Sequence, residues 1–136
     1  MYATIRLMVI ARLFFMSIMM LIPSFVLAQS DEAELVLFNQ IVTGRIDNLS
    51  PQRMYVFEAL RCDYISIKIT TTIGNLDPVV TLINPDGSLL AYQDDANGTE
   101  DVHLRAVAMP TTGQYTLVVS RFGYNMGTTA GSYELL

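Results

Sequence analysis

Beyond residue 33, hydrophobic and polar residues alternate with a period of two, which is the pattern of β-strands that bury one face. In the clearest run, Ile65, Ile67 and Ile69 share one face while polar side chains occupy the other. No stretch of this part of the chain places its hydrophobic residues at helical spacing. The other alternating segments predict these inward-facing residues: Tyr55, Phe57 and Ala59; Val102, Leu104, Ala106 and Ala108; Tyr115, Leu117 and Val119; Tyr133 and Leu135.

Clusters of Gly, Pro, Asn and Asp separate the alternating segments and predict turns. Short strands divided by turns about every eight to twelve residues, with no helix between them, are typical of antiparallel sandwiches. The pattern therefore predicts an all-β domain, an antiparallel β-sandwich or jelly roll of about eight or nine strands. The turn clusters lie at residues 47–51, 61–63, 73–75, 84–87, 96–98 and 110–113.

The N-terminal segment departs from this alternation and has the features of a secretory signal peptide. Arg6 and Arg12 supply its positive region, and residues 13–22 form an apolar run that ends at Pro23. A membrane anchor is the alternative, but an apolar run of this length is too short to span a bilayer. We therefore expect a cleaved signal peptide.

Cleavage after the signal peptide divides the chain into three parts. Residues 1–28 are the signal peptide, residues 29–39 are a leader that has room for a first strand, and residues 40–136 form the sandwich. The expected location is secreted or periplasmic, with no membrane association after cleavage.

The charge of the exported part limits its partners. Residues 29–136 carry six Lys and Arg against thirteen Asp and Glu, a net charge of −7. This balance argues against a nucleic acid or an anionic membrane, because both need a basic patch. The only cysteine, Cys62, cannot form an internal disulfide. We expect it to be a half-buried turn residue rather than a reactive thiol, since no basic cluster is apparent to lower its pKa.

A predicted hairpin gathers acidic residues at its open end. Residues 84–87, Asn-Pro-Asp-Gly, suit a type I turn. Closing the turn between Asn84 and Gly87 pairs Leu82 with Leu89 and Val80 with Ala91. The same register sets Asp77 against Asp94, whereas a one-residue bulge would set Asp77 against Asp95.

Facing carboxylates repel each other, so this arrangement needs compensation. One explanation is that the carboxylates accept hydrogen bonds from backbone N–H groups of the loop. The other is a calcium ion, because residues 95–101 place oxygen-bearing side chains around a glycine, as in half of a calcium loop. Both explanations stay open. The candidate calcium ligands are Asp77, Asp94, Asp95, Asn97 and Asp101.

The ordered motifs of the chain resemble the bacterial pre-peptidase C-terminal (PPC) domain family. The resemblance runs from about residue 40 to the end, and it departs from the family at Cys62, where a Gly usually precedes Asp63. A Cys there is strained if the position needs a positive φ. The matching segments are Gly44–Ile46 (G-x-I), Tyr55–Phe57 (Y-x-F), Ile65–Ile67 (I-x-I), Leu76–Pro78 (LDP), Pro85–Gly87 (P-x-G), Leu90–Asp95 (LA-x-x-DD), Pro110–Tyr115 (P-x-x-G-x-Y) and Gly131–Leu135 (G-x-Y-x-L).

The resemblance implies a non-catalytic β-sandwich that accompanies exported proteins, often secreted peptidases. It further implies binding or attachment to an extracellular polymer, either protein or polysaccharide. Relatives on clostridial collagenases bind calcium and attach to collagen. The alternative role is that of a secretion or folding helper for a separately encoded extracellular peptidase.

Two groups of residues bear on catalysis and ligand binding. The only histidine, His103, has no nucleophile elbow to serve, which argues against a hydrolase. Phe122 and Tyr124 follow a predicted strand, and with Tyr92 they form a candidate binding platform for a sugar or a peptide. The alternative is that these aromatic rings pack over the end of the sandwich.

Overall fold

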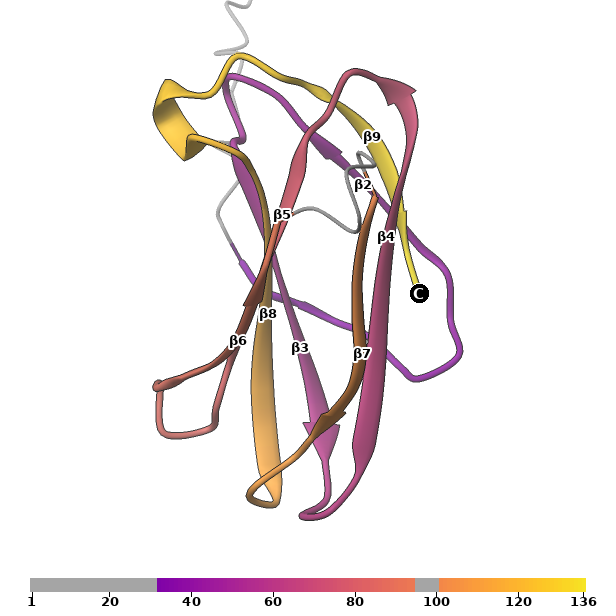
Figure 1. Cartoon of the computed structure of the whole chain (residues 1–136), viewed down its shortest axis with the longest axis vertical. Coiled ribbons are helices and arrows are strands. Elements are labelled where there is room, and N and C mark those ends of the chain that lie inside the picture. Colours follow the sequence, from indigo (N-terminus) through magenta and orange to yellow (C-terminus); the bar gives the residue numbers. More distant parts are fainter. Residues whose placement is uncertain (1–31, 95–100) are drawn as a thin grey trace, which may run out of the picture.

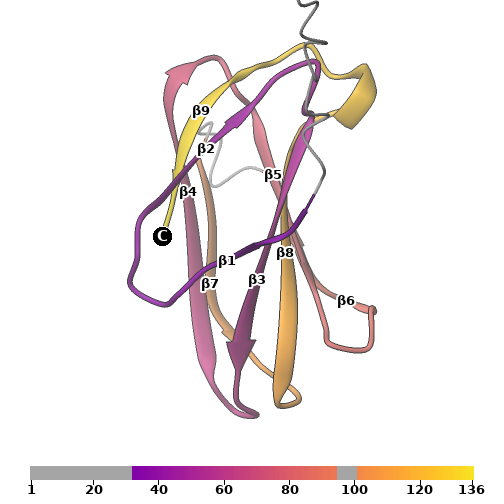
Figure 2. The ribbon, with the colours of Figure 1, turned by 180° about the vertical axis from the view of Figure 1, so that it is seen from behind.

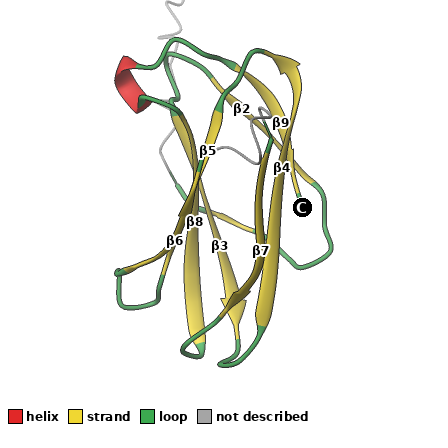
Figure 3. Ribbon diagram, in the orientation of Figure 1, coloured by secondary structure: helices red, strands yellow, loops and turns green. Residues whose placement is uncertain are grey.

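A computed structural model describes residues 32–94 and 101–136, and it shows a β-sandwich of two sheets (Figures 1 and 3). Each sheet buries the inward-facing half of its alternating residues against the other sheet. The described part of the chain contains no helix long and apolar enough to cross a membrane.

The five-stranded sheet has the order β1-β3-β8-β5-β6. Its centre is formed by the long pairing of β3 with β8, from Gln52 opposite Ser120 to Ala59 opposite Gly113. Its strands are β1 (Glu34–Leu35), β3 (Gln52–Ala59), β5 (Pro78–Ile83), β6 (Leu89–Gln93) and β8 (Gly113–Arg121).

The four-stranded sheet has the order β2-β9-β4-β7 and is antiparallel throughout. Strand β4 is the longest of the fold, and β9 pairs with only its second half. The strands are β2 (Val42–Ile46), β4 (Tyr64–Gly74), β7 (Val102–Ala108) and β9 (Gly131–Leu135); a single 3-10 turn, η1 (Tyr124–Met126), lies between β8 and β9.

The core confirms most of the alternation seen in the sequence. Nearly every predicted inward residue is at least 90% buried, and the tyrosines Tyr55, Tyr115 and Tyr133 are among the largest fully buried side chains. Because these rings come from both sheets, they fill the space between the layers. The fold class expected from the sequence is therefore confirmed as a β-sandwich of nine strands within the described residues.

A buried pair of hydroxyl groups joins the two sheets. The Tyr55 Oη of β3 lies 2.7 Å from the Tyr133 Oη of β9, with both side chains shielded from solvent. Burial raises the pKa of both hydroxyls, so both stay protonated over a wide pH range. The ring of Tyr133 has room because Gly44 lies opposite it on β2, where a Cβ atom would overlap the ring. The glycine of the G-x-I motif and the tyrosine of the G-x-Y-x-L motif therefore contact each other.

The expectation of wholly antiparallel pairing is wrong at one edge. Strand β1 runs parallel to β3, with Glu34 opposite Tyr55 (Figure 2). Only two residues pair, because the chain then turns away to cross to the other sheet.

The predicted inward positions of Ala106 and Ala108 are also wrong, and both residues are exposed. A bulge in β7 places two residues, Arg105 and Ala106, opposite Ser66 of β4. Ala106 takes a φ of 48°, and its N–H donates to the Ser66 hydroxyl at 3.1 Å. The extra residue shifts the alternation, so Met109 points inward in their place.

The hairpin closes as predicted at its turn but not in its register. The Gly87 N–H donates to the Asn84 carbonyl at 2.9 Å, and Gly87 has a φ of 84°. However, Leu82 faces Ala91 and Val80 faces Gln93, two residues away from the simple register and one from the bulged alternative. The turn adds one residue and an irregularity beside Ile83 adds another. Extending this register sets Asp94 opposite Val79 rather than Asp77.

Candidate binding site

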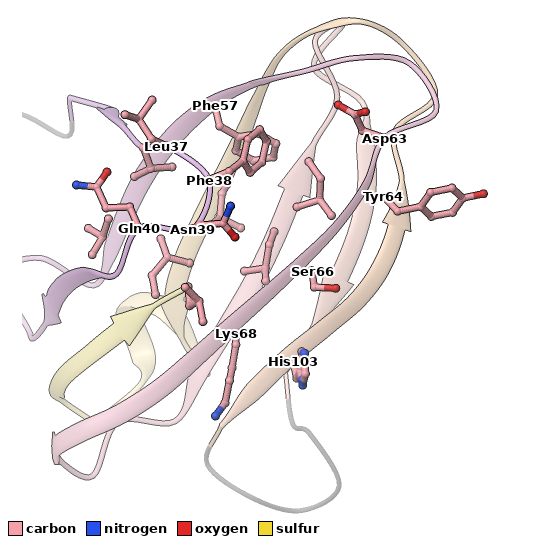
Figure 4. A pocket seen from close by; sticks show the side chains of 17 residues that line it. Leu37, Phe38, Asn39, Gln40, Phe57, Asp63, Tyr64, Ser66, Lys68 and His103 are labelled. Carbon is pink, nitrogen blue, oxygen red and sulfur yellow. The ribbon is translucent and has the colours of Figure 1, made fainter.

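A hollow of about 680 Å³ opens where β9 ends and the β1–β2 segment swings away from the sheet (Figure 4). Residues 36–40 and Val42 form one wall, and the first half of β4 forms the other. The inner wall is apolar, because the core residues Phe57, Ile67 and Leu117 reach the surface of the hollow there.

Exposed apolar side chains surround the hollow. Phe38 is 53% exposed, and its ring meets Phe57 edge to face at 5.7 Å. Leu37, Tyr64 and Leu136 are also more than half exposed. Apolar side chains gathered around one opening are typical of an interaction surface.

The hollow lies beside the first half of β4, whereas β9 pairs with the second half. Lys68 and Leu136 exchange backbone hydrogen bonds of 2.8 and 3.0 Å at the last rung between β4 and the C-terminal residues. Before this rung, residues 64–67 pair with β7 on one side, and on the other side no described strand pairs with them. We call residues 64–67 the open half of β4.

Two residues of basic type, Lys68 and His103, line the same opening. Lys68 on β4 lies directly opposite His103 on β7, and the Arg105 Nε donates to the His103 Nδ1 at 3.2 Å. Elsewhere on the surface, Arg45 forms an ion pair with Asp47 at 3.4 Å. The hollow is therefore lined by Lys68 and His103, with Arg105 beside His103, and also by the acidic Asp63.

The other notable polar residue lies at the end of the sandwich that carries η1. Arg121 is only 3% exposed, and its guanidinium Nε donates to the Tyr124 carbonyl at 2.7 Å. Its Nη1 donates to the Asn48 Oδ1 at 2.7 Å and to the Thr129 carbonyl at 3.1 Å. This side chain therefore ties the β2–β3 turn to the segment between β8 and β9. Sequence reasoning missed it, although Arg121 continues the inward phase of Tyr115 to Val119.

The structure separates the aromatic residues predicted as a binding platform. Phe122 and Tyr124 follow β8 and are 57% and 41% exposed. Tyr92, 55% exposed, lies on β6 opposite Thr81, which in turn faces Val118 of β8. The four residues from Val118 to Phe122 correspond to about 13 Å along the strand. Ligand binding by these three residues stays a prediction.

The predicted calcium ligands lie partly outside the described residues, since Asp95 and Asn97 belong to 95–100. The Asp101 carboxylate accepts a hydrogen bond from the Thr71 N–H at 3.2 Å, and the Asp77 carbonyl accepts one from the Phe122 N–H at 2.9 Å. The described His, Cys, Asp and Glu residues contain no group of three placed to hold a metal ion. Calcium binding stays a prediction.

The prediction for Cys62 is corrected in part. It is a turn residue with a φ of 74°, so the suspected strain is present, but its side chain is exposed rather than half-buried. The Cys62 N–H donates to the Met109 carbonyl at 2.9 Å, and this hydrogen bond helps to hold the turn in place.

No family model matches the chain, and no curated protein matches it either. Among solved structures, the pre-peptidase C-terminal domain of a collagenase from Bacillus anthracis matches with a TM-score of 0.59 and 22% identity, over 76% of this chain and 92% of that one. Two periplasmic inhibitors of g-type lysozyme, PliG from Salmonella Typhimurium and PliG from Aeromonas hydrophila, match with TM-scores of 0.45 and identities of 20% and 11%, over 76% of this chain and 94% and 93% of theirs. The likeness to the collagenase domain shows that this chain has the β-sandwich fold of a pre-peptidase C-terminal domain, as its motifs indicated.

Proposed function

We propose that the protein is an exported, non-catalytic module that attaches to an extracellular polymer through the hollow beside the open half of β4. The main support for this proposal is that exposed apolar side chains surround a hollow of about 680 Å³. This volume falls within the range of about 300–1,000 Å³ that is usual for ligand sites. Exposed leucine and phenylalanine side chains lower the solubility of a protein, and contact with a partner would remove them from water.

A matched pair of leucines tests the location of the site. Leu37 at the rim and Leu89 on the β5–β6 hairpin are 67% and 63% exposed, and only Leu37 lines the hollow. The protein and its Leu37→Ser and Leu89→Ser variants are applied to immobilised peptidoglycan, collagen-like peptide and polysaccharide. We expect retention on one polymer, weakened by Leu37→Ser and unchanged by Leu89→Ser. Retention on none of the three would contradict attachment and favour the alternative, a helper for a secreted peptidase.

We also propose that calcium stabilises the loop after β6. The support is the density of oxygen-bearing side chains at residues 94–101 and the usual extracellular calcium sites, which have Kd values of about 10⁻⁴ to 10⁻³ M. At 5 mM calcium such a site would add about 1–2 kcal/mol to the free energy of unfolding. Thermal unfolding in calcium is compared with unfolding in magnesium and in chelator. Identical curves in all three would rule out the site.

A further inference from the structure

We propose that a second pocket, on the side of the sandwich where β1 and β2 are the edge strands, binds one sugar residue through its hydroxyl groups. This inference goes beyond the proposed function, because the pocket shares no lining residue with the hollow. Its support is a buried tyrosine proton without an acceptor among the described residues, together with balanced charges around it. We call this site the tyrosine pocket; its polar lining residues are Glu34, Thr43, Arg45, Arg53, Tyr55 and Ser132.

Both sheets contribute walls to the tyrosine pocket. Glu34 of β1 lies opposite Tyr55 of β3, and Arg45 of β2 lies opposite Ser132 of β9. The Arg53 Nε donates to the Arg45 carbonyl at 3.4 Å, so the Arg53 side chain reaches from one sheet to the other. The volume of about 380 Å³ falls within the range of about 300–1,000 Å³ that is usual for ligand sites.

The tyrosine hydroxyl pair beside this pocket has one proton that its own hydrogen bond does not use. Two hydroxyls carry two protons, and the hydrogen bond between the Tyr55 and Tyr133 Oη atoms uses one of them. Among the described residues neither hydroxyl has another hydrogen-bond partner. Of the two tyrosines only Tyr55 lines the pocket, so we assign the unused proton to Tyr55, directed into the pocket. Both side chains are almost completely buried, and buried donors of this kind nearly always have an acceptor.

A water molecule is the simplest acceptor for this proton, and it is the competing explanation. However, one molecule of liquid water occupies about 30 Å³. The tyrosine pocket, with its volume of about 380 Å³, has room for a ligand that accepts this proton and also reaches the charged groups of the walls.

The charges of the pocket favour a neutral polar ligand over a simple ion. Arg45 and Arg53 are positive and Glu34 is negative. Arg45 also forms an ion pair with Asp47, so the charges of the two signs balance. An anion would be attracted by the arginines and repelled by the carboxylates, and a cation would meet the reverse. A sugar hydroxyl both donates and accepts, so a sugar can donate to Glu34 while it accepts from Tyr55 and from an arginine.

The first experiment asks whether a sugar enters the tyrosine pocket. Glucose, galactose and N-acetylglucosamine are titrated separately into isotopically labelled protein, and glycine and sodium sulfate serve as ionic comparators. We expect at least one sugar to shift the NMR signals of the Gly44 and Ser132 amides to saturation. The expected Kd is on the order of 1 mM for a ligand of about a dozen non-hydrogen atoms. Saturation by none of the three sugars would leave water as the occupant and overturn the inference, and so would tighter binding of glycine or sulfate.

A matched pair of glutamates tests the acceptor role of Glu34. Glu34 and Glu58 are both exposed, but only Glu34 lines the tyrosine pocket. Glu34→Gln should weaken sugar binding about fivefold, because it replaces a charged acceptor with a neutral one. Glu58→Gln should leave the Kd within about twofold. Equal effects of the two substitutions would contradict binding in this pocket.

A pair of tyrosine variants tests the unused proton. Tyr55→Phe removes the O–H group that faces the pocket, whereas Tyr133→Phe leaves it in place. Each variant keeps one buried hydroxyl without its partner, so the two should lose similar stability. We expect Tyr55→Phe to weaken sugar binding at least tenfold and Tyr133→Phe to weaken it much less. Equal losses of affinity in the two folded variants would overturn the assignment of the proton.

The outcomes separate this inference from the proposed function. If Leu37→Ser weakens retention on a polymer but no sugar shifts the Gly44 amide, attachment at the hollow stands and the tyrosine pocket holds no sugar. If a sugar saturates the Gly44 amide and Leu37→Ser changes nothing, the tyrosine pocket stands and attachment at the hollow fails. If neither sugar nor polymer binds, both proposals fail.

Discussion

At the end of the sandwich that carries η1, Arg121 binds three oxygen atoms from two loops, whereas at the hollow exposed apolar side chains surround an apolar inner wall. Both regions lie at the border of the apolar core. In the first region the guanidinium group of Arg121 donates to the protein's own oxygen atoms, so that region contributes to stability. In the second region apolar side chains are exposed to solvent, which is typical of an interaction surface.

The largest expected effect on stability comes from removing the hydrogen bonds of Arg121 at the end of the sandwich that carries η1. Arg121→Met keeps most of the apolar stem but removes all three hydrogen bonds of the guanidinium group, including the one to the Asn48 Oδ1. We expect a loss of about 3 kcal/mol in the free energy of unfolding, measured by urea denaturation. Arg61→Met, at an exposed turn position, is the control and should change stability by less than about 0.5 kcal/mol. A small effect at Arg121 would show that the loops hold together without it.

A second change removes one hydroxyl group from the buried pair formed by Tyr55 and Tyr133. Tyr133→Phe leaves the Tyr55 hydroxyl buried without its partner, and we expect a loss of about 1–2 kcal/mol. The double variant Tyr55→Phe/Tyr133→Phe removes both hydroxyls and should recover part of that loss. A double-mutant cycle measures the coupling free energy, and strict additivity would contradict a direct interaction.

The same pair makes stability depend on pH at the alkaline end. Because burial raises the pKa of both tyrosines, the unfolded chain loses these protons near the usual value of 10.0 while the folded chain keeps them. Stability is therefore fully present below pH 10 and falls as the pH rises further. The double phenylalanine variant should show a shallower fall in urea denaturation between pH 9 and 11.

A smaller effect of opposite sign is expected at the turn before β4. Cys62 has a φ of 74°, a region that costs a residue with a Cβ roughly 1 kcal/mol. Cys62→Gly should raise the free energy of unfolding by somewhat less than about 1 kcal/mol, since glycine also loses more entropy on folding. Cys62→Ala is the matched control and should not gain. A gain in both variants would point to the thiol rather than the backbone.

The smallest effect on stability is expected at the hollow. Leu37→Ser changes a side chain that is 67% exposed, so we expect a change below about 0.5 kcal/mol in urea denaturation, together with the loss of retention described above. Loss of both stability and retention would mean that the hollow belongs to the core, and the contrast between the two regions would disappear.

The sequence predicted the strands well because their alternation depends on local burial. Ile65, Ile67 and Ile69 are buried as expected, and so are the tyrosines of β3, β8 and β9. Arg121 was missed because a charged side chain in the inward phase looks like the end of a strand. One of its acceptors, the Asn48 Oδ1, lies in the β2–β3 turn, and no local pattern shows a contact between residues so far apart in the chain.

The pairing register of the strands was the other feature that the sequence did not predict. The bulge at Ala106 shifts one ladder by one residue, and the two extra residues of the hairpin shift another by two; small alanines give little signal against such shifts. The hollow was missed for a related reason, because its walls come from segments far apart in the chain: residues 36–40, the first half of β4, and Leu117 of β8.

The contact of Gly44 with Tyr133 has an evolutionary consequence. The aromatic ring occupies the space that any other residue at position 44 would need. A homologue with a larger residue at position 44 must also have a smaller residue than tyrosine at position 133. A homologue without the tyrosine no longer needs glycine at position 44. Among homologues the two positions should therefore change together, although they stand near opposite ends of the domain's sequence.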